Sequence, residues 1–278
     1  MLYGLIVYGI MNHVSALAAE YLVALGIGAL LSALFWIVER RQSRGSYLAN
    51  YLYFPFYLAW VYALQSAAAP LLSRVVMTAR GGLLSRIVAP YPGLLTEIVV
   101  TVLFAVIWDV WQYWVHRWQH ASPILWQSHK LHHSDAALNS STQARHHPLN
   151  YVVNLACYAP MLLLFGSLAP HAVAAFFMFR VWGFVNHANV RISFGPLTGL
   201  IAGPQWHRIH HSIAPEHIDR NFATFFPFID RLFGTYYAPA GDEYPPTGLV
   251  SGEHEPFLRQ ATISPFIAWY RDLTDARL

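Results

Sequence analysis

The sequence predicts an all-α fold, an integral membrane helical bundle with a histidine-rich polar region on one side. Hydrophobic residues make up 56% of the 278 residues and charged residues only 11%, whereas a soluble domain carries about 25% charged residues. Several apolar stretches approach or exceed the roughly 20 residues that a helix needs to cross a bilayer. The chain also contains 15 histidines, and most of them lie in short clusters after residue 115.

Five apolar stretches are the predicted membrane helices: residues 18–38, 47–72, 93–115, 149–165 and 168–185. The charged residues Glu39, Arg40 and Arg41 end the first stretch. Residues 75–92 are mixed in character and are expected to form a loop or a helix that lies at the membrane surface. The last two stretches are short and are joined by Gly166 and Ser167, which predicts a helical hairpin.

The distribution of Lys and Arg predicts the orientation, because cytoplasmic loops carry an excess of these residues. One side of the predicted bundle carries Arg40, Arg41, Arg44, Arg117, Lys130 and Arg145. The other side carries Arg74, Arg80 and Arg86. The histidine-rich region is therefore expected to face the cytoplasm, from the inner membrane of a bacterium or, in a eukaryote, from the endoplasmic reticulum.

Three segments divide the chain by composition: N-terminal membrane helices with the surface segment (1–92), a histidine-bearing catalytic region (93–240) and a polar C-terminal tail (241–278). The single cysteine, Cys157, excludes an intrachain disulfide and a cysteine-based metal site. The start lacks a positively charged segment and is not expected to be a cleaved signal peptide. The formal net charge of +3 does not indicate a nucleic-acid partner.

Three histidine clusters follow helical spacing. They consist of His116 and His120, then His129, His132 and His133, then His207, His210 and His211. Residues three or four apart lie on one face of a helix, so each cluster is expected to present its imidazoles together. Ser122-Pro123 and Gly203-Pro204 are typical helix starts ahead of the second and third clusters. A lone histidine is usually a packing residue, but this repeated pattern is hard to assign to packing.

Imidazole is a good ligand for iron, zinc, copper and nickel, so the eight clustered histidines are the predicted metal ligands and catalytic residues. His187 is expected to be a ninth ligand, and His147 is either a ligand, a partner of a ligand or a helix cap. Asp109 is expected to hold the second N–H of a ligand or to bond to a buried Tyr or Trp. His146 is expected to be exposed. Four other histidines are not assigned to the site: His13, His171, His217 and His254.

In these motifs the chain resembles the fatty acid hydroxylase / sterol desaturase superfamily, over about residues 108–237. The matching pieces are Asp109-x-x-x-Tyr113-Trp114-x-His116, Leu125-Trp126-x-x-His129, Thr142-x-x-Arg145-x-His147-Pro148, Asn186-His187-Ala188-Asn189, Asp219-Arg220-Asn221-Phe222 and Asp230-Arg231-Leu232-Phe233-Gly234-Thr235, together with the three clusters. Ile229 and Asn150 depart from the family pattern, in which Trp and Glu are common. The three residues between His116 and His120 are similar to the sterol desaturase branch.

The resemblance implies a membrane-bound oxidoreductase of lipid metabolism with a cytosolic, histidine-rich cap. It implies two iron ions held by the clusters, O2 as co-substrate, and hydroxylation or desaturation of a sterol-like or fatty-acyl membrane lipid. Zinc binds histidine-rich sites readily and is expected in some purified samples. The two electrons are expected to come from an external protein such as a ferredoxin, cytochrome b5 or a reductase.

Three other functions compete for these histidines. A membrane haem protein would place single histidines opposite one another across spans. A divalent-metal carrier would hold its ligands near the middle of broken helices. A zinc-dependent lipid hydrolase would need only three or four protein ligands. The number and position of the clusters favour the di-iron interpretation over all three.

Overall fold

A computed structural model describes residues 26–31, 33–35, 44–78, 82–165, 170–252 and 255–275. All regular elements in these ranges are helices, apart from one isolated β-bridge between Ser212 and Thr247. The all-α prediction is therefore confirmed. Of the predicted span 18–38, only residues 26–31 and 33–35 lie within the described part of the chain, as helix.

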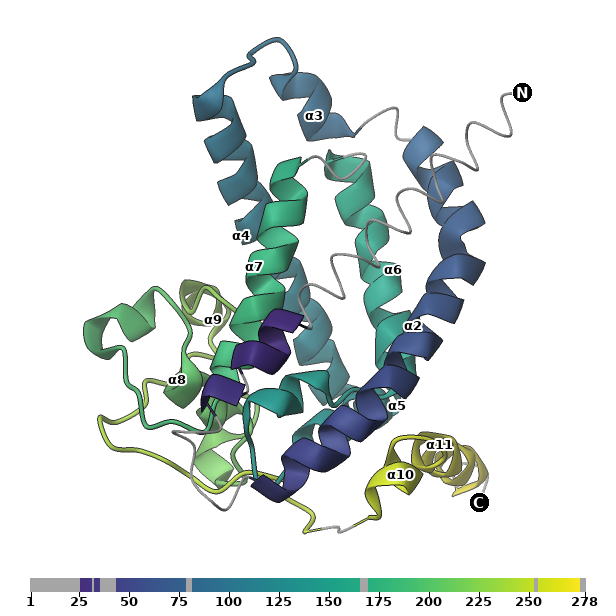
Figure 1. Ribbon diagram of the computed structural model, residues 1–278, viewed down its shortest axis with the longest axis vertical. Helices are drawn as coiled ribbons and strands as arrows, with labels where there is room; N and C mark the ends of the chain where they lie inside the picture. The colour runs from purple at the N-terminus through teal and green to yellow at the C-terminus, as the bar shows by residue number, and fades with distance from the viewer. Residues whose placement is uncertain are drawn as a thin grey trace.

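The long helices run side by side and the short elements gather at one end of them (Figure 1). The long helices and the short α3 beside them are α2 (Arg44–Thr78), α3 (Leu83–Val88), α4 (Leu94–Ala121), α6 (Pro148–Phe165) and α7 (Pro170–Asn186). Phe104 of α4 packs against Phe165 of α6 with ring centroids 4.9 Å apart. The same buried cluster includes Phe179 of α7, so α4 is the helix around which the other two are packed.

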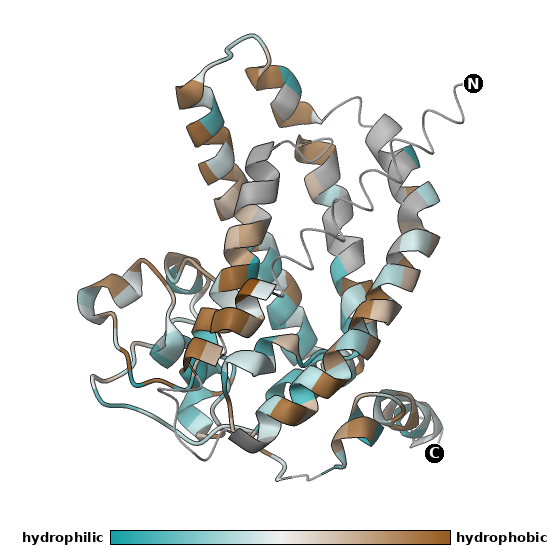
Figure 2. Cartoon of the chain, viewed as in Figure 1, coloured by the Kyte–Doolittle hydropathy of each residue, from teal (hydrophilic) through white to brown (hydrophobic). Residues whose placement is uncertain are grey.

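Among the helices that the structure describes, α4 is long and apolar enough to cross a membrane. Its first half exposes large apolar side chains such as Leu94, Leu95 and Val102, and this part is mostly brown in Figure 2. The helix begins where the sequence predicts but continues six residues beyond Val115, to Ala121. This extension carries His116 and His120, so both histidines lie on the C-terminal continuation of the apolar helix α4.

The other predicted spans also form helices. Residues 47–72 lie inside α2, residues 149–165 lie in α6 and residues 170–185 lie in α7. Residues 166–169, which include the predicted turn at Gly166 and Ser167, lie outside the described residues. The surface segment predicted at 75–92 begins with the last turn of α2 and then contains α3. The arrangement of these helices across a bilayer stays a prediction.

The short elements form the end of the molecule that carries the histidines: α5 (Pro123–His133), η2 (Ser140–Ala144), η3 (Gly195–Gly199), α8 (Pro204–His210), η4 (Pro215–His217), α9 (Phe228–Phe233), α10 (Phe257–Gln260) and α11 (Ser264–Asp275). Both predicted helix starts are confirmed. Ser122 is the N-cap of α5, with its hydroxyl accepting from the backbone N–H of Leu125, and Gly203 precedes α8. Pro123 and Pro204 take the first helical positions, where no backbone N–H is needed.

Residues 241–278, expected to be a polar tail, contain α10 and α11. The second of these helices packs against α5, and the indole N–H of Trp269 donates to the backbone oxygen of Ile124. This end of the chain therefore supports the back of the helix whose other face carries His129 and His133.

A buried polar network fixes the end of α5. The Arg145 guanidinium donates to the backbone oxygen of Leu131 at 2.9 Å and to the Ser134 hydroxyl at 2.6 Å. Asp135 accepts from the Thr142 hydroxyl at 2.7 Å. The side-chain amide of Asn50, on α2, donates to the hydroxyl of Ser141, the residue before Thr142. Buried polar groups are stable when they are paired in this way, so the turn after the second histidine cluster is held in one conformation.

Candidate metal centre

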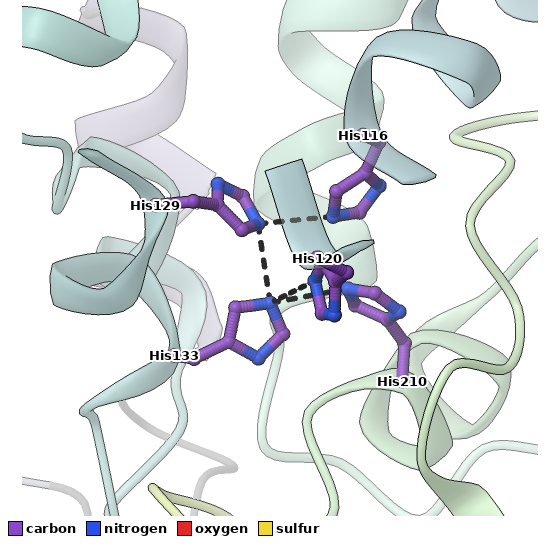
Figure 3. A group of neighbouring side chains, drawn as sticks. All are labelled: His116, His120, His129, His133 and His210. Atoms are coloured by element: carbon purple, nitrogen blue, oxygen red, sulfur yellow. Dashed lines mark hydrogen bonds between the residues drawn. The ribbon is translucent and has the colours of Figure 1, made fainter. Parts of the chain in front are cut away.

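Nine histidines converge in two adjacent groups. The first group consists of His116, His120, His129, His133 and His210, and the second of His132, His187, His207 and His211. Within each group, one ring nitrogen per residue lies within 4.8 Å of all the others. Figure 3 shows the five rings of the first group pointing toward one another from three parts of the chain.

The helical clusters are divided between the two groups. On α5, His129 and His133 enter the first group while His132 enters the second. The third cluster mirrors this pattern, because His207 and His211 enter the second group and His210 enters the first. Residues four apart are displaced by only about 40° around a helix of 3.6 residues per turn, and the intervening residue points to another side. Each of these clusters therefore contributes to both groups.

The nitrogens of the first group approach one another closely. The Nε2 atoms of His116 and His129 are 3.0 Å apart, and those of His120 and His133 are 3.1 Å apart. His133 Nε2 also lies 3.2 Å from the Nε2 atom of His210. These contacts link all three clusters at one point, as the dashed lines in Figure 3 show.

The second group is built around His187. Its Nε2 atom lies 3.0 Å from the Nε2 atoms of both His132 and His207, and His207 Nε2 lies 3.2 Å from that of His211. His187 Nδ1 is 2.6 Å from the backbone oxygen of Gly183. A carbonyl oxygen only accepts, so a neutral His187 ring carries its proton on Nδ1 and presents a lone pair at Nε2.

The protonation of these rings fits metal binding. Burial lowers the pKa of six imidazoles well below the usual value, namely those of His129, His132, His133, His207, His210 and His211. Burial also lowers the pKa of His187 to about 4. The rings are therefore neutral at pH 7, which is the state in which imidazole binds a metal.

The spacing of the nitrogens also fits metal binding. Two nitrogen ligands that stand about 2.1 Å from a metal ion and at right angles to each other are about 3.0 Å apart. The observed separations of 3.0–3.2 Å match that value. Rings whose Nδ1 atom donates to a backbone oxygen, such as His187, present a lone pair at Nε2 toward their neighbours, so the residues present suit one cation in each group.

The two groups lie side by side. The rings of His133 and His211, one from each group, are stacked with centroids 4.3 Å apart and planes 19° apart. His132 and His133 are neighbours in sequence and point to different groups, with ring centroids 5.7 Å apart. The geometry thus provides two neighbouring positions for metal ions.

The two histidines before Pro148 lie outside both groups. His147 is buried, but its Nε2 atom donates to the backbone oxygen of Thr262 and its Nδ1 atom accepts from the backbone N–H of Leu149. It therefore acts as a cap and tether, which is one of the roles the sequence left open. The expectation that His146 is exposed is wrong: it is half-buried, its ring stacks on His132 at 4.6 Å, and burial lowers its pKa to about 3.

The roles expected for Asp109 are also wrong. Within the described residues, this fully buried carboxylate forms no hydrogen bond to a ligand histidine, a Tyr or a Trp. It accepts the backbone N–H groups of Thr224, Phe225 and Phe226 at 2.7–3.0 Å. Helical spacing placed it on the histidine face, but a loop 115 residues later occupies that space. Asp109 therefore anchors a loop.

The same loop and helix α9, which follows it, contain groups whose roles sequence reasoning missed. Asp219, Arg220 and Phe222 hold the second nitrogens of three histidines. Asp230 accepts the backbone N–H groups of Phe222 and Ala223. Two Asp-Arg motifs at positions 219 and 230 were the available signal, but neither has a spacing that indicates what it contacts.

His217, which the sequence left outside the site, also lies outside both groups. Its ring bonds to Glu243 at 2.8 Å and to the Ser212 hydroxyl at 2.9 Å. Because Ser212 directly follows His211, these two bonds of His217 connect Glu243 and its segment, residues 241–248, to the end of α8.

Comparison with known proteins is consistent with this geometry. Residues 101–235 match the profile of the family described as fatty acid hydroxylase. The chain is 35% identical over 136 residues to alkylglycerol monooxygenase of Danio rerio, covering 49% of this chain and 30% of that protein. It is 30% identical over 164 residues to the ornithine lipid hydroxylase OlsE of Rhizobium tropici, covering 57% and 48%. A methylsterol monooxygenase of Arabidopsis thaliana is 26% identical over 158 residues, covering 52% and 50%.

The chain thus spans about 30% of the length of the alkylglycerol monooxygenase and about half of the other two proteins. No solved structure matches.

Proposed function

From the membership of residues 101–235 in the fatty acid hydroxylase family, we propose that the chain is a membrane-bound oxidoreductase. It uses O2 to hydroxylate or desaturate a membrane lipid at a di-iron centre. The observation that carries this proposal is the pair of adjacent, buried, all-histidine groups. Nine neutral ligands add no negative charge, so two bound cations would keep a strongly electrophilic character.

Two iron ions, one in each histidine group, would supply the activation of O2 and the removal of hydrogen from an unactivated C–H bond. The protein's part is to hold the ligands and exclude water. Four of the ligands are deeply buried in the second group, while His116 and His120 of the first group are half-buried. The accessible edge of the pair therefore lies beside the last turn of α4, where the apolar helix ends.

The substrate is proposed to be a lipid whose reacting carbon reaches the end of α4 from the membrane. Four alkylglycerol monooxygenases are among the similar proteins, so an alkylglycerol is the first substrate to test. Ornithine lipids and methylsterols follow, because their names occur among the other relatives. The electrons are proposed to come from an external ferredoxin, cytochrome b5 or reductase.

The proposed placement keeps the orientation inferred from Lys and Arg. The α2, α4, α6 and α7 helices would lie in the membrane and the histidine end would face the cytoplasm. Residues 1–92 would form the membrane helices and surface segment, 93–240 the catalytic region and 241–278 its C-terminal support.

The decisive experiment combines metal analysis with isotope incorporation. Protein purified without air from iron-replete cells is expected to contain about two coupled iron ions per chain by Mössbauer spectroscopy. With 18O2, an electron donor and lipid, a hydroxylated product is expected to carry one 18O atom. The His132→Ala, His210→Ala double variant removes one ligand from each group and is expected to lose both the iron and the activity.

The competing functions predict different results. Lipid turnover without O2 and with zinc bound would favour a hydrolase. Metal uptake into vesicles without any lipid product would favour a divalent-metal carrier. A parent protein with no coupled iron and no change in the double variant would contradict the di-iron proposal.

A further inference from the structure

One loop holds three of the five rings in the first histidine group from behind. The Nδ1 atom of His210 donates to the backbone oxygen of Arg220 at 2.9 Å. The Nδ1 atom of His116 donates to the backbone oxygen of Phe222 at 2.9 Å. The Nδ1 atom of His120 lies 3.4 Å from a carboxylate oxygen of Asp219. Four consecutive residues therefore provide all three partners.

The backbone of this loop has an unusual conformation. Asp219 and Asn221 have φ angles of 57° and 60°, in the left-handed region that non-glycine residues seldom adopt. Aspartate and asparagine tolerate this region better than other side chains do. The turns at these two positions flank Arg220 and let the oxygens of Arg220 and Phe222 reach different histidines.

Two fully buried carboxylates keep the loop in this shape. Asp230 accepts from the backbone N–H groups of Phe222 at 2.7 Å and Ala223 at 2.9 Å, and from the Thr235 hydroxyl at 2.7 Å. Asp109 accepts the next three N–H groups, those of residues 224–226. The Asn221 side chain bonds to the backbone of Trp206 and Tyr237. The conformation is thus fixed by side chains outside the metal centre.

Within the described residues, this loop makes no hydrogen bond to a ring of the second histidine group. His187 donates to Gly183 within its own helix region. In the part of the chain that the structure describes, the Nδ1 atoms of His132, His207 and His211 have no hydrogen-bond partner, and in the first group the same holds for His129. The two groups therefore differ in what orients their rings.

We propose that residues 219–223 form an orienting loop for one of the two metal positions, with Asp219 and Asp230 as positioning residues that act on the five-histidine group alone. This inference rests on the proposed function. Asp219 acts directly on His120, and Asp230 acts on His116 through the backbone of Phe222. Partners of metal ligands typically contribute about 10–100-fold to metal affinity.

The test is an anaerobic titration of metal-free protein with Fe(II), followed by metal analysis and Mössbauer spectroscopy. The parent chain is expected to bind two iron ions, which are magnetically coupled in its Mössbauer spectrum. The Asp230→Ala variant is expected to retain about one iron per chain after dialysis, and that iron is expected to be uncoupled. Asp219→Gly is expected to weaken one of the two sites by about 10–100-fold, because glycine keeps the left-handed φ and removes the carboxylate.

Two control variants separate positioning from general destabilisation. Asp219→Asn keeps an oxygen acceptor and tolerates the left-handed φ, so it is expected to restore most of the affinity that Asp219→Gly loses. Glu243→Gln alters a carboxylate that bonds to His217 and to the backbone N–H of Ala240, not to the orienting loop. It is expected to keep both irons.

The outcomes are distinct. If Asp219→Gly binds both irons as tightly as the parent chain does, the inference is overturned and the proposed function is left intact. Loss of both irons together in a folded Asp219→Gly protein would also overturn it, because a selective role would be absent. A parent chain that binds no iron overturns the proposed function and this inference with it. If Asp230→Ala does not fold, the exposed position of Asp219 makes its variants sufficient.

Discussion

Replacing His187 with alanine is expected to remove one metal ion and to lower lipid oxidation by more than about 100-fold, since even the partners of ligands are worth about 10–100-fold. His187 Nε2 lies 3.0 Å from two other ring nitrogens of the four-histidine group. The variant leaves that group with three ligands, and this loss is expected to weaken its hold on iron below what survives purification. Metal content per chain and the rate of lipid turnover measure the effect.

The matched control is His147→Asn. His147 is as buried as His187, at 2% exposed, but it contacts the backbone of Thr262 and Leu149 and neither histidine group. Its replacement is expected to leave two metal ions in place. Equal metal contents in the two variants would remove His187 from the ligand set.

Replacing Asp109 with alanine is expected to lower the free energy of unfolding by roughly 3–5 kcal/mol. The carboxylate accepts three backbone N–H groups in a fully buried setting. A buried donor left without a partner costs about 1–3 kcal/mol, and the loss of several charge-assisted bonds at one site accumulates. Thermal unfolding of metal-free protein in detergent, followed by tryptophan fluorescence, measures the change.

Glu97→Ala is the control on the same helix, because its carboxylate lies in the exposed first turn of α4. Exposed substitutions usually change stability by less than about 0.5 kcal/mol. An Asp109→Ala protein as stable as Glu97→Ala would show that the loop does not depend on the carboxylate. Metal-free protein is essential here, because bound metal would stabilise both variants by mass action.

The helices and the ligand candidates were accessible from sequence because both are local properties. Apolar stretches predicted α2, α4, α6 and α7 to within a few residues, apart from the added turns of α4. Helical spacing predicted that His129 and His133 would point in one direction. His187 was selected because it follows an apolar stretch on the correct side, and the structure places it at the centre of the second group.

The division of ligands between two groups was decided by tertiary structure. Spacing indicated that each cluster shares one face, yet His132 and His210 point away from their cluster partners into the other group. Side chains leave a helix on several sides, and the positions of the neighbouring helices determine which histidine group each side chain enters. The spacing of the histidines does not specify how α4, α5, α7 and α8 are placed relative to one another, so it could not predict this division.

The sequence by itself determined the all-helical fold, the limits of most long helices and the candidate nitrogen ligands that the structure brings together. Only the tertiary structure decided which carboxylates support them. Asp109 bonds to loop residues that are 115 to 117 positions away, Asp230 bonds to the preceding part of the same loop, and His146 stacks on the ring of His132 from α5. Local patterns report which face a residue occupies, but hydrogen-bond partners depend on chain segments that meet only after folding.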